Sequence, residues 1–390
     1  MKKSSKMLKK CRLFEKIGYV FRIVCSIPFT LKTPKNNNIW LMGLGDDNYA
    51  NNGKVFYEFL KENHPEIEVF WVCEKENKKQ LSQHIKEDTL LSRGTLKNYI
   101  MAAKAKVAIY GFSDFDIAPG YYRILKKRKT LLVNISHGFD GLKGMPEDYY
   151  KPLPVDLLCA ASDYEKTAKI EKCGADESKV VVTGFARYDN WNVDSSRGEK
   201  IKKVFIMPTW RDWYESENAE WSETTLFKQY DMLFDKLENL AETNDFEVEY
   251  NFHPRMKLFF ENAHWDEYNR IKQVDENKSI QESLIWADLV VTDYSSIFWD
   301  ALYMKKQLIL FWVDEKEYRQ KRGLLAEDDF YPYLAKNTEQ FLSIFESLNN
   351  KEFKDIDIVE KYFNWQDKNN CKRIYEEIEK IAQKHQVVID

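Results

Sequence analysis

From residue 38 onward, short apolar runs rich in β-branched and aromatic residues alternate with segments of helical periodicity. This alternation is typical of parallel sheets covered by helices, because parallel strands are buried on both faces and are joined by crossover helices. It predicts strands at 38–43, 68–73, 107–110, 130–135, 157–160, 179–183, 203–207, 247–252, 288–292 and 308–313. It predicts helices at 54–63, 95–104, 163–172, 223–242, 279–286, 295–304, 337–348 and 371–385.

The alternation stops at a polar, turn-forming stretch, residues 190–200, and restarts at residue 203. A chain of 390 residues also exceeds what one hydrophobic core normally organises. We therefore expect an α/β fold of two Rossmann-like domains that face a central cleft, with ligands beyond the carboxyl ends of the strands. The expected boundaries are 36–190 and 200–370 for the two domains, with 371–390 as a final helix.

Residues 1–35 form a strongly basic arm, with ten Lys and Arg side chains against one Glu and a net charge of +9, whereas the whole chain carries −4. Apolar residues recur in this arm at helical spacing: Leu13, Phe14, Ile17, Val20, Phe21 and Val24. Lys16 and Arg22 interrupt the run, which is too broken to span a bilayer or to serve as a signal peptide. A basic amphipathic helix can lie on an anionic membrane surface, and a solvated helix packed on the protein body is the alternative.

The remaining composition excludes several classes of protein. The net charge of −4 and the pI near 6.0 argue against a nucleic-acid partner, which needs a concentrated basic surface. The six cysteines have no spacing typical of a metal site, so we expect reduced thiols in the cytosol, no metal and no cofactor. Asp114-Phe115-Asp116 could hold a metal–nucleotide complex, but an acidic pair in a surface turn is the commoner origin of such a triplet.

Two of the six histidines directly follow predicted strands, one in each expected domain. His137 precedes Gly138, and His253 precedes Pro254. A histidine at the carboxyl end of a strand lies where a ligand cleft is expected, and its pKa suits proton transfer near neutral pH. A structural histidine is the alternative for either residue alone, but the paired arrangement favours catalysis. The other four lie in helix or loop contexts and are expected at the surface: His64, His84, His264 and His385.

Side chains suited to phosphate follow other predicted strands. Thr292-Asp293-Tyr294-Ser295-Ser296 opens a helix, whose free N–H groups and two hydroxyls could bind an anion. Arg211 in MPTWRD and Arg187 in GFARYD offer guanidinium groups for bidentate phosphate contacts, and Lys143 adds a cation. Helix capping and surface salt bridges are the structural alternatives for these serines and arginines. Together the residues predict a ligand that carries a pyrophosphate.

Neither the phosphate-binding pattern GxxxxGK[ST] nor the dinucleotide pattern GxGxxG occurs in the sequence. Kinases, GTPases and dinucleotide-dependent dehydrogenases therefore lose support. A transferase that uses a nucleoside diphosphate donor remains.

These motifs resemble the CDP-glycerol glycerophosphotransferase family, which primes and polymerises wall teichoic acids and builds related capsular polymers. TDYSSIFWDALYMKKQLILF at 292–311 is the most specific element, followed by MPTWRD at 207–212 and NFHPRM at 251–256. GFARYD at 184–189 is similar to a further family motif, and ISHGFDGLKG at 135–144 resembles its block less well. Ala186 stands where proline is usual, Ser136 where tryptophan is usual, and Asn51 or Asn52 where an acidic residue is usual.

The resemblance implies a GT-B-like fold and a peripheral enzyme on the cytoplasmic face of the cell membrane. It implies a CDP-glycerol or CDP-ribitol donor bound by the C-terminal domain, and a lipid-linked saccharide or glycerol-phosphate acceptor on the N-terminal domain. His137 and His253 carry over as the catalytic residues. The residues that carry over as substrate contacts are Gly138, Lys143, Arg187, Thr209, Arg211, Thr292, Asp293, Ser295, Ser296 and Asp300.

The expected reaction transfers glycerol phosphate, or a related alditol phosphate, from the CDP-alcohol to an acceptor hydroxyl and releases CMP. Either histidine would take the hydroxyl proton while the other neutralises charge on the phosphate. A nucleotide-sugar glycosyltransferase of the same fold is one alternative, because one fold hosts many chemistries. A non-catalytic nucleotide-binding scaffold at the membrane is the second.

Overall fold

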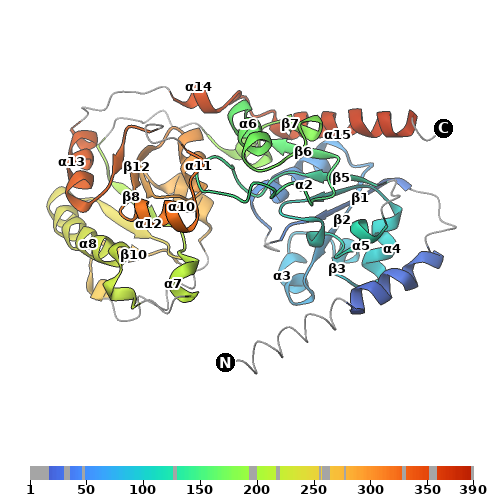
Figure 1. Ribbon diagram of the computed structural model, residues 1–390, viewed down its shortest axis with the longest axis horizontal. Coiled ribbons are helices and arrows are strands. Elements are labelled where there is room, and N and C mark those ends of the chain that lie inside the picture. The colour runs from blue at the N-terminus through green and yellow to red at the C-terminus, as the bar shows by residue number, and fades with distance from the viewer. Residues whose placement is uncertain are drawn as a thin grey trace. The chain divides into compact units, whose positions relative to one another are not determined.

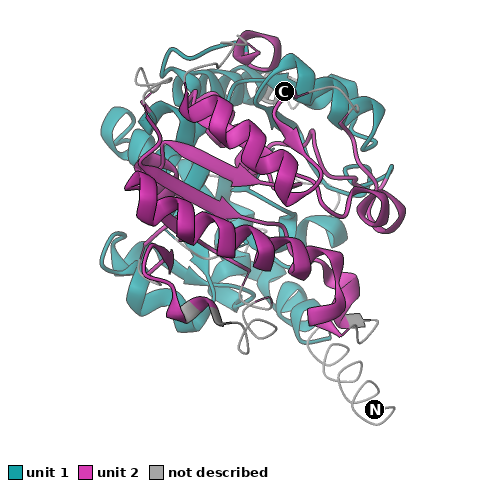
Figure 2. Cartoon of the chain, turned by 90° about the vertical axis from the view of Figure 1, so that its left-hand side faces the viewer, with its two compact units in different colours: residues 1–137, 147–191, 364–390 teal, residues 138–146, 192–363 magenta. Residues whose placement is uncertain are grey.

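The structure is a computed structural model in which the chain forms two compact units (Figure 2). It describes residues 17–29, 36–45, 49–125, 130–192, 200–216, 220–253, 256, 264–275, 278–326, 331–350 and 358–387. Unit 1 comprises Met1–His137, Glu147–Trp191 and Asn364–Asp390. Unit 2 comprises Gly138–Pro146 and Asn192–Phe363.

Unit 1 is built on a seven-stranded, fully parallel sheet of order β3-β2-β1-β4-β5-β6-β7. Its strands are β1 (Asn36–Gly43), β2 (Glu68–Cys73), β3 (Leu90–Ser92), β4 (Ala105–Tyr110), β5 (Leu131–Asn134), β6 (Leu157–Ala160) and β7 (Val180–Val182). Its labelled helices are α2 (Asn51–Asn63), α3 (Lys78–Leu81), α4 (Leu96–Lys104), α5 (Tyr121–Ile124), α6 (Asp163–Glu171) and α15 (Asn370–Val387) (Figure 1). The strand order reverses between β1 and β4, the place where doubly wound sheets bind ligands.

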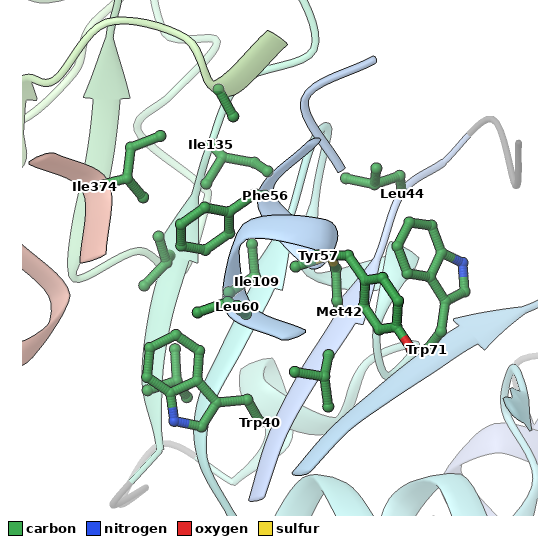
Figure 3. Close-up of a cluster of buried hydrophobic side chains, with 14 of the residues drawn as sticks. Trp40, Met42, Leu44, Phe56, Tyr57, Leu60, Trp71, Ile109, Ile135 and Ile374 are labelled. Carbon is green, nitrogen blue, oxygen red and sulfur yellow. The ribbon is translucent and has the colours of Figure 1, made fainter. Parts of the chain in front are cut away.

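Alternate residues of β1 face the two cores of unit 1, as the two-residue period of a strand requires. Trp40 and Met42 belong to one cluster, in which Phe56 of α2 and Ile374 of α15 are also buried (Figure 3). Leu41 faces a second cluster on the other side of the sheet. Burial on both faces explains why the strands of this unit are continuous apolar runs in the sequence.

Unit 2 contains a six-stranded parallel sheet of order β10-β9-β8-β11-β12-β13. Its strands are β8 (Lys203–Met207), β9 (Glu247–Tyr250), β10 (Ile271–Gln273), β11 (Leu289–Thr292), β12 (Gln307–Phe311) and β13 (Leu334–Ala335). Its labelled helices are α7 (Asp212–Ser216), α8 (Thr225–Asn244), α10 (Ile280–Trp286), α11 (Ile297–Tyr303), α12 (Glu315–Lys321), α13 (Thr338–Asn349) and α14 (Val359–Tyr362). The strand order reverses between β8 and β11, so this sheet has the same topology as the core of unit 1.

The division into units differs from the expected boundaries first at residues 138–146, which belong to unit 2 although unit 1 surrounds them in sequence. Backbone hydrogen bonds explain this assignment. Gly144 N donates to Gly323 O at 2.8 Å, and Leu325 N donates to Leu142 O at 2.9 Å. A Cβ atom on Gly144 would lie 2.2 Å from a backbone oxygen, so only glycine allows this close approach.

The second difference concerns the C-terminal segment, because Asn364–Asp390 belongs to unit 1 rather than forming a separate helix beyond a domain that ends at residue 370. Asp189 anchors the start of α15. Its Oδ1 accepts from Asn370 N at 2.9 Å, and its Oδ2 accepts from Cys371 N at 2.8 Å. A carboxylate at a helix N-terminus accepts hydrogen bonds from free N–H groups and is attracted to the positive end of the helix dipole.

Residues 17–29 of the basic arm form a helix, whereas residues 1–16 and 30–35 lie outside the described residues. One side of the helix packs on unit 1 through Ile23, which is 1% exposed, and Arg22 Nη1 donates to Gly94 O at 3.1 Å. Another side exposes four apolar side chains: Ile17, Val20, Phe21 and Val24. Across the described part of the chain, no helix has the length and apolar character needed to cross a membrane.

Candidate functional site

The candidate residues lie at or just beyond the carboxyl ends of the strands, distributed over both units. Unit 1 holds His137 after β5 and Arg187 after β7. The other ten belong to unit 2: Gly138, Lys143, Thr209, Arg211, His253, Thr292, Asp293, Ser295, Ser296 and Asp300. The carboxyl ends of parallel strands share one edge of a sheet, which is where ligands of such folds bind.

His137 is exposed, and its ring stacks on Phe112 with the ring centroids 4.1 Å apart. Phe112 follows β4, so two adjacent strand ends meet at this histidine. The preceding residue, Ser136, is buried and has a φ of +58°, which is uncommon for a residue with a Cβ atom. The position of His137 thus depends on a strained backbone that neighbouring groups must hold.

Arg187 contacts the loop that carries His137. The resemblance implies that both residues belong to the site. Arg187 Nη1 donates to His137 O at 3.1 Å, and only 3% of the arginine is exposed. The guanidinium also lies over the rings of Phe185 and Tyr188, at 4.9 and 5.3 Å from their centroids. These contacts fix the guanidinium beside the histidine loop.

Asn52, in α2, is a site residue that the motif analysis did not select. Its side chain is 2% exposed and bonds to Ser136 O and to Arg187 N. The sequence contains two signals for it: Asn51-Asn52 follows the first strand of a doubly wound sheet, and one of the two stands where an acidic residue is usual in the family. Neither signal separates Asn52 from Asn51 or from an ordinary helix-start residue.

Asp293 joins two strand ends in unit 2. Its Oδ1 accepts from Thr209 N at 2.8 Å and from Thr209 Oγ1 at 2.6 Å. Thr292 Oγ1 donates to Met207 O at 2.6 Å, so the loops after β8 and β11 are bonded twice. Thr292 and Asp293 are completely buried, whereas Thr209 is half-buried. Thr292 and Asp293 therefore brace the two strand ends, and Thr209 keeps accessible surface at the strand edge.

Arg211 is also completely buried, which argues against the direct donor contact that we expected of it. Its Nε and Nη2 bond to Asp314 at 2.7 and 2.9 Å, and Nη2 also bonds to Asp293 at 2.8 Å. Burial alone would lower the pKa of Arg211, but the two carboxylates raise it well above the ordinary value. The guanidinium therefore stays charged and supports the loops that carry Thr209 and Asp293.

Ser295 and Ser296 are half-buried at the start of α11 and therefore accessible. Ser295 Oγ accepts from Ile297 N at 3.4 Å. Gly138 lies against Ser296, because a Cβ atom on this glycine would be 3.0 Å from Ser296 Oγ. Asp300, in the first turn of α11, is 9% exposed. The expected contacts Gly138 and Ser296 thus come together at one place in unit 2.

Lys143 lies in the same segment as Gly138 and forms an antiparallel bridge with Leu324. Burial lowers the pKa of its ammonium below the usual value. Asp140 opposes this shift and Arg322 adds to it. A bound anion would favour the charged form of this lysine.

His253 follows β9 and is exposed, with its ring stacked on Trp210 at a centroid distance of 5.7 Å. Its carbonyl oxygen accepts from Met256 N at 2.7 Å. Pro254 and Arg255, which follow it in the sequence, lie outside the described residues. Trp210 belongs to the MPTWRD motif, so two of the quoted motifs meet at this histidine.

Asp114 and Asp116 are used by the fold. Asp114 forms a bidentate ion pair with Arg123, with a shortest distance of 2.8 Å. Asp116 Oδ2 accepts from Phe112 N at 2.8 Å and from Ser113 N at 3.1 Å. Both carboxylates of the triplet are buried, whereas Phe115 between them is exposed. Within the described residues, no group of three or more His, Cys, Asp and Glu side chains is arranged to hold a metal ion.

The described cysteines are free thiols: Cys25, Cys73, Cys159, Cys173 and Cys371. Burial raises the pKa of Cys159 to about 12, which keeps this thiol protonated and unreactive. Cys11 lies outside the described residues. A cavity of about 590 Å³ in unit 1, lined among others by Tyr150, Lys151 and Lys179, contains none of the predicted site residues.

Two doubly wound parallel sheets, with histidine, hydroxyl and cationic side chains beyond their strands, define a GT-B-like α/β protein. Residues 25–380 match the family described as CDP-Glycerol:Poly(glycerophosphate) glycerophosphotransferase. The chain belongs to this family, which confirms the resemblance seen in the motifs. It is therefore a member of a family of transferases that act in cell-wall polymer synthesis.

Individual relatives are distant in sequence. The minor teichoic acid biosynthesis protein GgaB of Bacillus subtilis is 22% identical over 97% of this chain. A teichoic acid poly(glycerol phosphate) polymerase of Bacillus spizizenii is 25% identical, with 96% of this chain and 99% of the relative covered. The chain spans 42% of the length of GgaB, so it corresponds to less than half of that relative.

The fold is shared with the wall teichoic acid polymerase TagF. Its solved structure superimposes with a TM-score of 0.65 at 16% identity and covers 98% of both chains. A variant of that polymerase was soaked with CDPG, and this structure gives a TM-score of 0.63. The superposition, at this low identity, shows a common fold.

Proposed function

We propose that the chain transfers glycerol phosphate, or a related alditol phosphate, from a CDP-alcohol to a hydroxyl of a lipid-linked acceptor in teichoic acid or capsular polymer synthesis, with release of CMP. The observation that supports this most is the group of accessible hydroxyls in unit 2. Ser296 lies against Gly138. Asp293, which lies two residues before Ser295, accepts a hydrogen bond from the hydroxyl of Thr209. Hydroxyl donors at the carboxyl edge of such a sheet are suited to a nucleotide diphosphate.

In this proposal unit 2 binds the donor. Thr209, Ser295 and Ser296 donate hydrogen bonds to the pyrophosphate, and the ammonium of Lys143 supplies charge. Arg211 and Asp293 act behind these residues, because their buried ion pair fixes the loops from which the hydroxyls extend. The partial desolvation of Lys143 strengthens its attraction to an anion.

The acceptor hydroxyl attacks the phosphorus that carries the alditol. The new phosphodiester P–O bond forms as the P–O bond to the CMP phosphate breaks, and the electron pair of that bond leaves with CMP. We assign removal of the hydroxyl proton to His137 in unit 1, and stabilisation of the phosphate charge to His253 in unit 2. Such phosphoryl transfers depend chiefly on positioning and charge stabilisation, so the chain needs no covalent intermediate.

We also propose that the chain acts at the cytoplasmic face of the cell membrane as a peripheral protein. Ile17, Val20, Phe21 and Val24 are spaced by three and four residues, so they form an apolar stripe. The stripe lies within a basic arm of ten cations and one anion. An anionic bilayer satisfies both features, since it accepts apolar side chains and attracts Lys and Arg.

Nucleotide release by the purified chain tests the proposed reaction. The donors are CDP-glycerol, CDP-ribitol and UDP-sugars, each with a short-chain lipid-linked acceptor. We expect CMP release from a CDP-alcohol and no UDP release. UDP release would show a glycosyltransferase instead, and tight binding of CDP-glycerol without any release would indicate a nucleotide-binding scaffold.

A further inference from the structure

Asn52 connects three strand-end loops of unit 1 through one buried side-chain amide. Its Nδ2 donates to Ser136 O at 2.9 Å and to Ile135 O at 3.3 Å, beyond β5. Its Oδ1 accepts from Arg187 N at 3.1 Å, beyond β7. Asn52 itself belongs to the start of α2, the helix that follows β1.

The loop that receives these bonds is strained and tightly held. Ser136 has a φ of +58°, and its N donates to Asn134 Oδ1 at 2.7 Å. Ser136 Oγ donates to Cys159 O at 3.0 Å and accepts from Lys169 Nζ at 3.3 Å. Lys169 is fully buried and paired with Glu165 at 3.0 Å. A residue in a sparsely populated backbone region persists only when its surroundings over-determine it.

The contacts of Asn52 and Arg187 fix both peptide groups that flank His137. Ser136 O belongs to the peptide that precedes His137, and Asn52 binds this oxygen. His137 O belongs to the peptide that follows, and Arg187 Nη1 binds it at 3.1 Å. Because Asn52 also binds the backbone of Arg187, three hydrogen bonds and the Ser136–His137 peptide link join Asn52, Ser136, His137 and Arg187 in a closed ring.

We propose that Asn52 is a positioning residue for His137. With both flanking peptides fixed, the direction in which the imidazole extends from the loop is fixed as well. This inference rests on the proposed role of His137 in proton removal. Asn52 acts through the backbone, so its loss affects the rate of transfer rather than the binding of a donor held by unit 2.

The variant Asn52→Asp tests the proposal because it preserves shape and the acceptor for Arg187 N. It removes both N–H donors and places a carboxylate oxygen against the carbonyl oxygens of Ile135 and Ser136. We expect kcat to fall by about 10- to 100-fold, the cost of misplacing a reacting group by roughly an ångström. We expect the KM for the CDP-alcohol to stay within about twofold, since misplacing the proton acceptor does not alter ground-state donor contacts.

The matched control is Asn51→Gly at the preceding position. Asn51 has a φ of +53°, which glycine adopts without strain, so kcat and KM are expected to remain at the wild-type level. A second readout needs no activity. In protein labelled with ¹⁵N-histidine, the imidazole signals of His137, assigned with His137→Gln, are followed over pH. Asn52→Asp is expected to shift these signals, and Asn51→Gly is expected to leave them in place.

These measurements distinguish failure of the positioning role of Asn52 from failure of the proposed transferase function. A wild-type chain that releases no CMP from any CDP-alcohol overturns the function, while the histidine signals still test Asn52. Unchanged kcat and unchanged His137 signals in Asn52→Asp overturn the positioning role, as does lower stability with unmoved His137 signals. Asn52→Ala is measured alongside in every case, because it removes the bonds without adding a charge and without restoring the acidic residue that is usual in the family at Asn51 or Asn52.

Discussion

Asp293 and Asn52 perform the same task in the two units, since each is a buried polar side chain that joins separate strand-end loops. Asp293 bonds to Thr209 and Arg211 after β8. Asn52 bonds to Ser136 after β5 and to Arg187 after β7. Buried polar groups with satisfied hydrogen bonds can specify a single loop geometry, which a site made from separate strand ends requires.

The sequence places Arg211 and Asp293 just beyond predicted strands, but it does not predict that both side chains are buried. From the sequence alone, an arginine just beyond a strand is as consistent with a phosphate ligand as with an ion-pair partner. The partner that decides between these readings is Asp314, 103 residues further along the chain. Local sequence patterns carry no information about such a long-range contact, and the same limit applies to Asn52.

Arg211→Met is expected to lower stability by about 3–5 kcal/mol, because it leaves the carboxylates of Asp293 and Asp314 buried without their cation. Urea unfolding followed by tryptophan fluorescence measures this change. His253→Ala is the matched comparison, since His253 is exposed whereas Arg211 is completely buried. It should unfold at the wild-type urea concentration and lose at least about 100-fold in turnover. An Arg211→Met protein of wild-type stability that fails to bind CDP-glycerol would return Arg211 to direct donor contact.

At the scale of elements, the long buried strands and the amphipathic helices are predictable. The expected strands 68–73, 157–160 and 203–207 have the observed bounds of β2, β6 and β8. The edge strands β3, β10 and β13 were not predicted, because they have two or three residues and lack the continuous β-branched run that marks the equally short β7. Helix α12 was missed for a related reason, since Tyr318 is its only residue that is buried.

The exposed apolar stripe on the helix at residues 17–29 is expected to bind an anionic membrane. The double variant Phe21→Gln with Val24→Gln removes two exposed apolar side chains from the stripe. We expect binding to phosphatidylglycerol vesicles to weaken at least about tenfold, since burying each apolar side chain is worth about 1.5–3 kcal/mol. Vesicle sedimentation measures the binding, and neutral phosphatidylcholine vesicles show the part due to charge.

The control for this helix is Met232→Gln on α8 of unit 2, where Met232 is 46% exposed and far from the basic arm in sequence. It is expected to bind vesicles as the wild type does. Wild-type binding by the double variant would assign the stripe to a contact other than a bilayer.

At the scale of the whole molecule, the sequence predicts two doubly wound units but not the path of the chain between them. Gly138–Pro146 belongs to unit 2 although it lies between two segments of unit 1. Asn364–Asp390 belongs to unit 1 although it follows a long segment of unit 2. The contacts responsible, Gly144 with Gly323 and Asp189 with Asn370, each join residues about 180 positions apart. The histidine block is divided as a result, with His137 in unit 1 and Gly138 in unit 2.

In the proposed reaction the phosphate moves together with the alditol. Mass spectrometry and ³¹P NMR of the lipid-linked acceptor after incubation with the chain and CDP-glycerol test this directly. We expect an acceptor heavier by glycerol phosphate, a new phosphodiester signal, and one CMP for each unit added. An acceptor that gains a sugar from a UDP-sugar, or gains nothing while CDP-glycerol remains bound and intact, would contradict the proposed reaction.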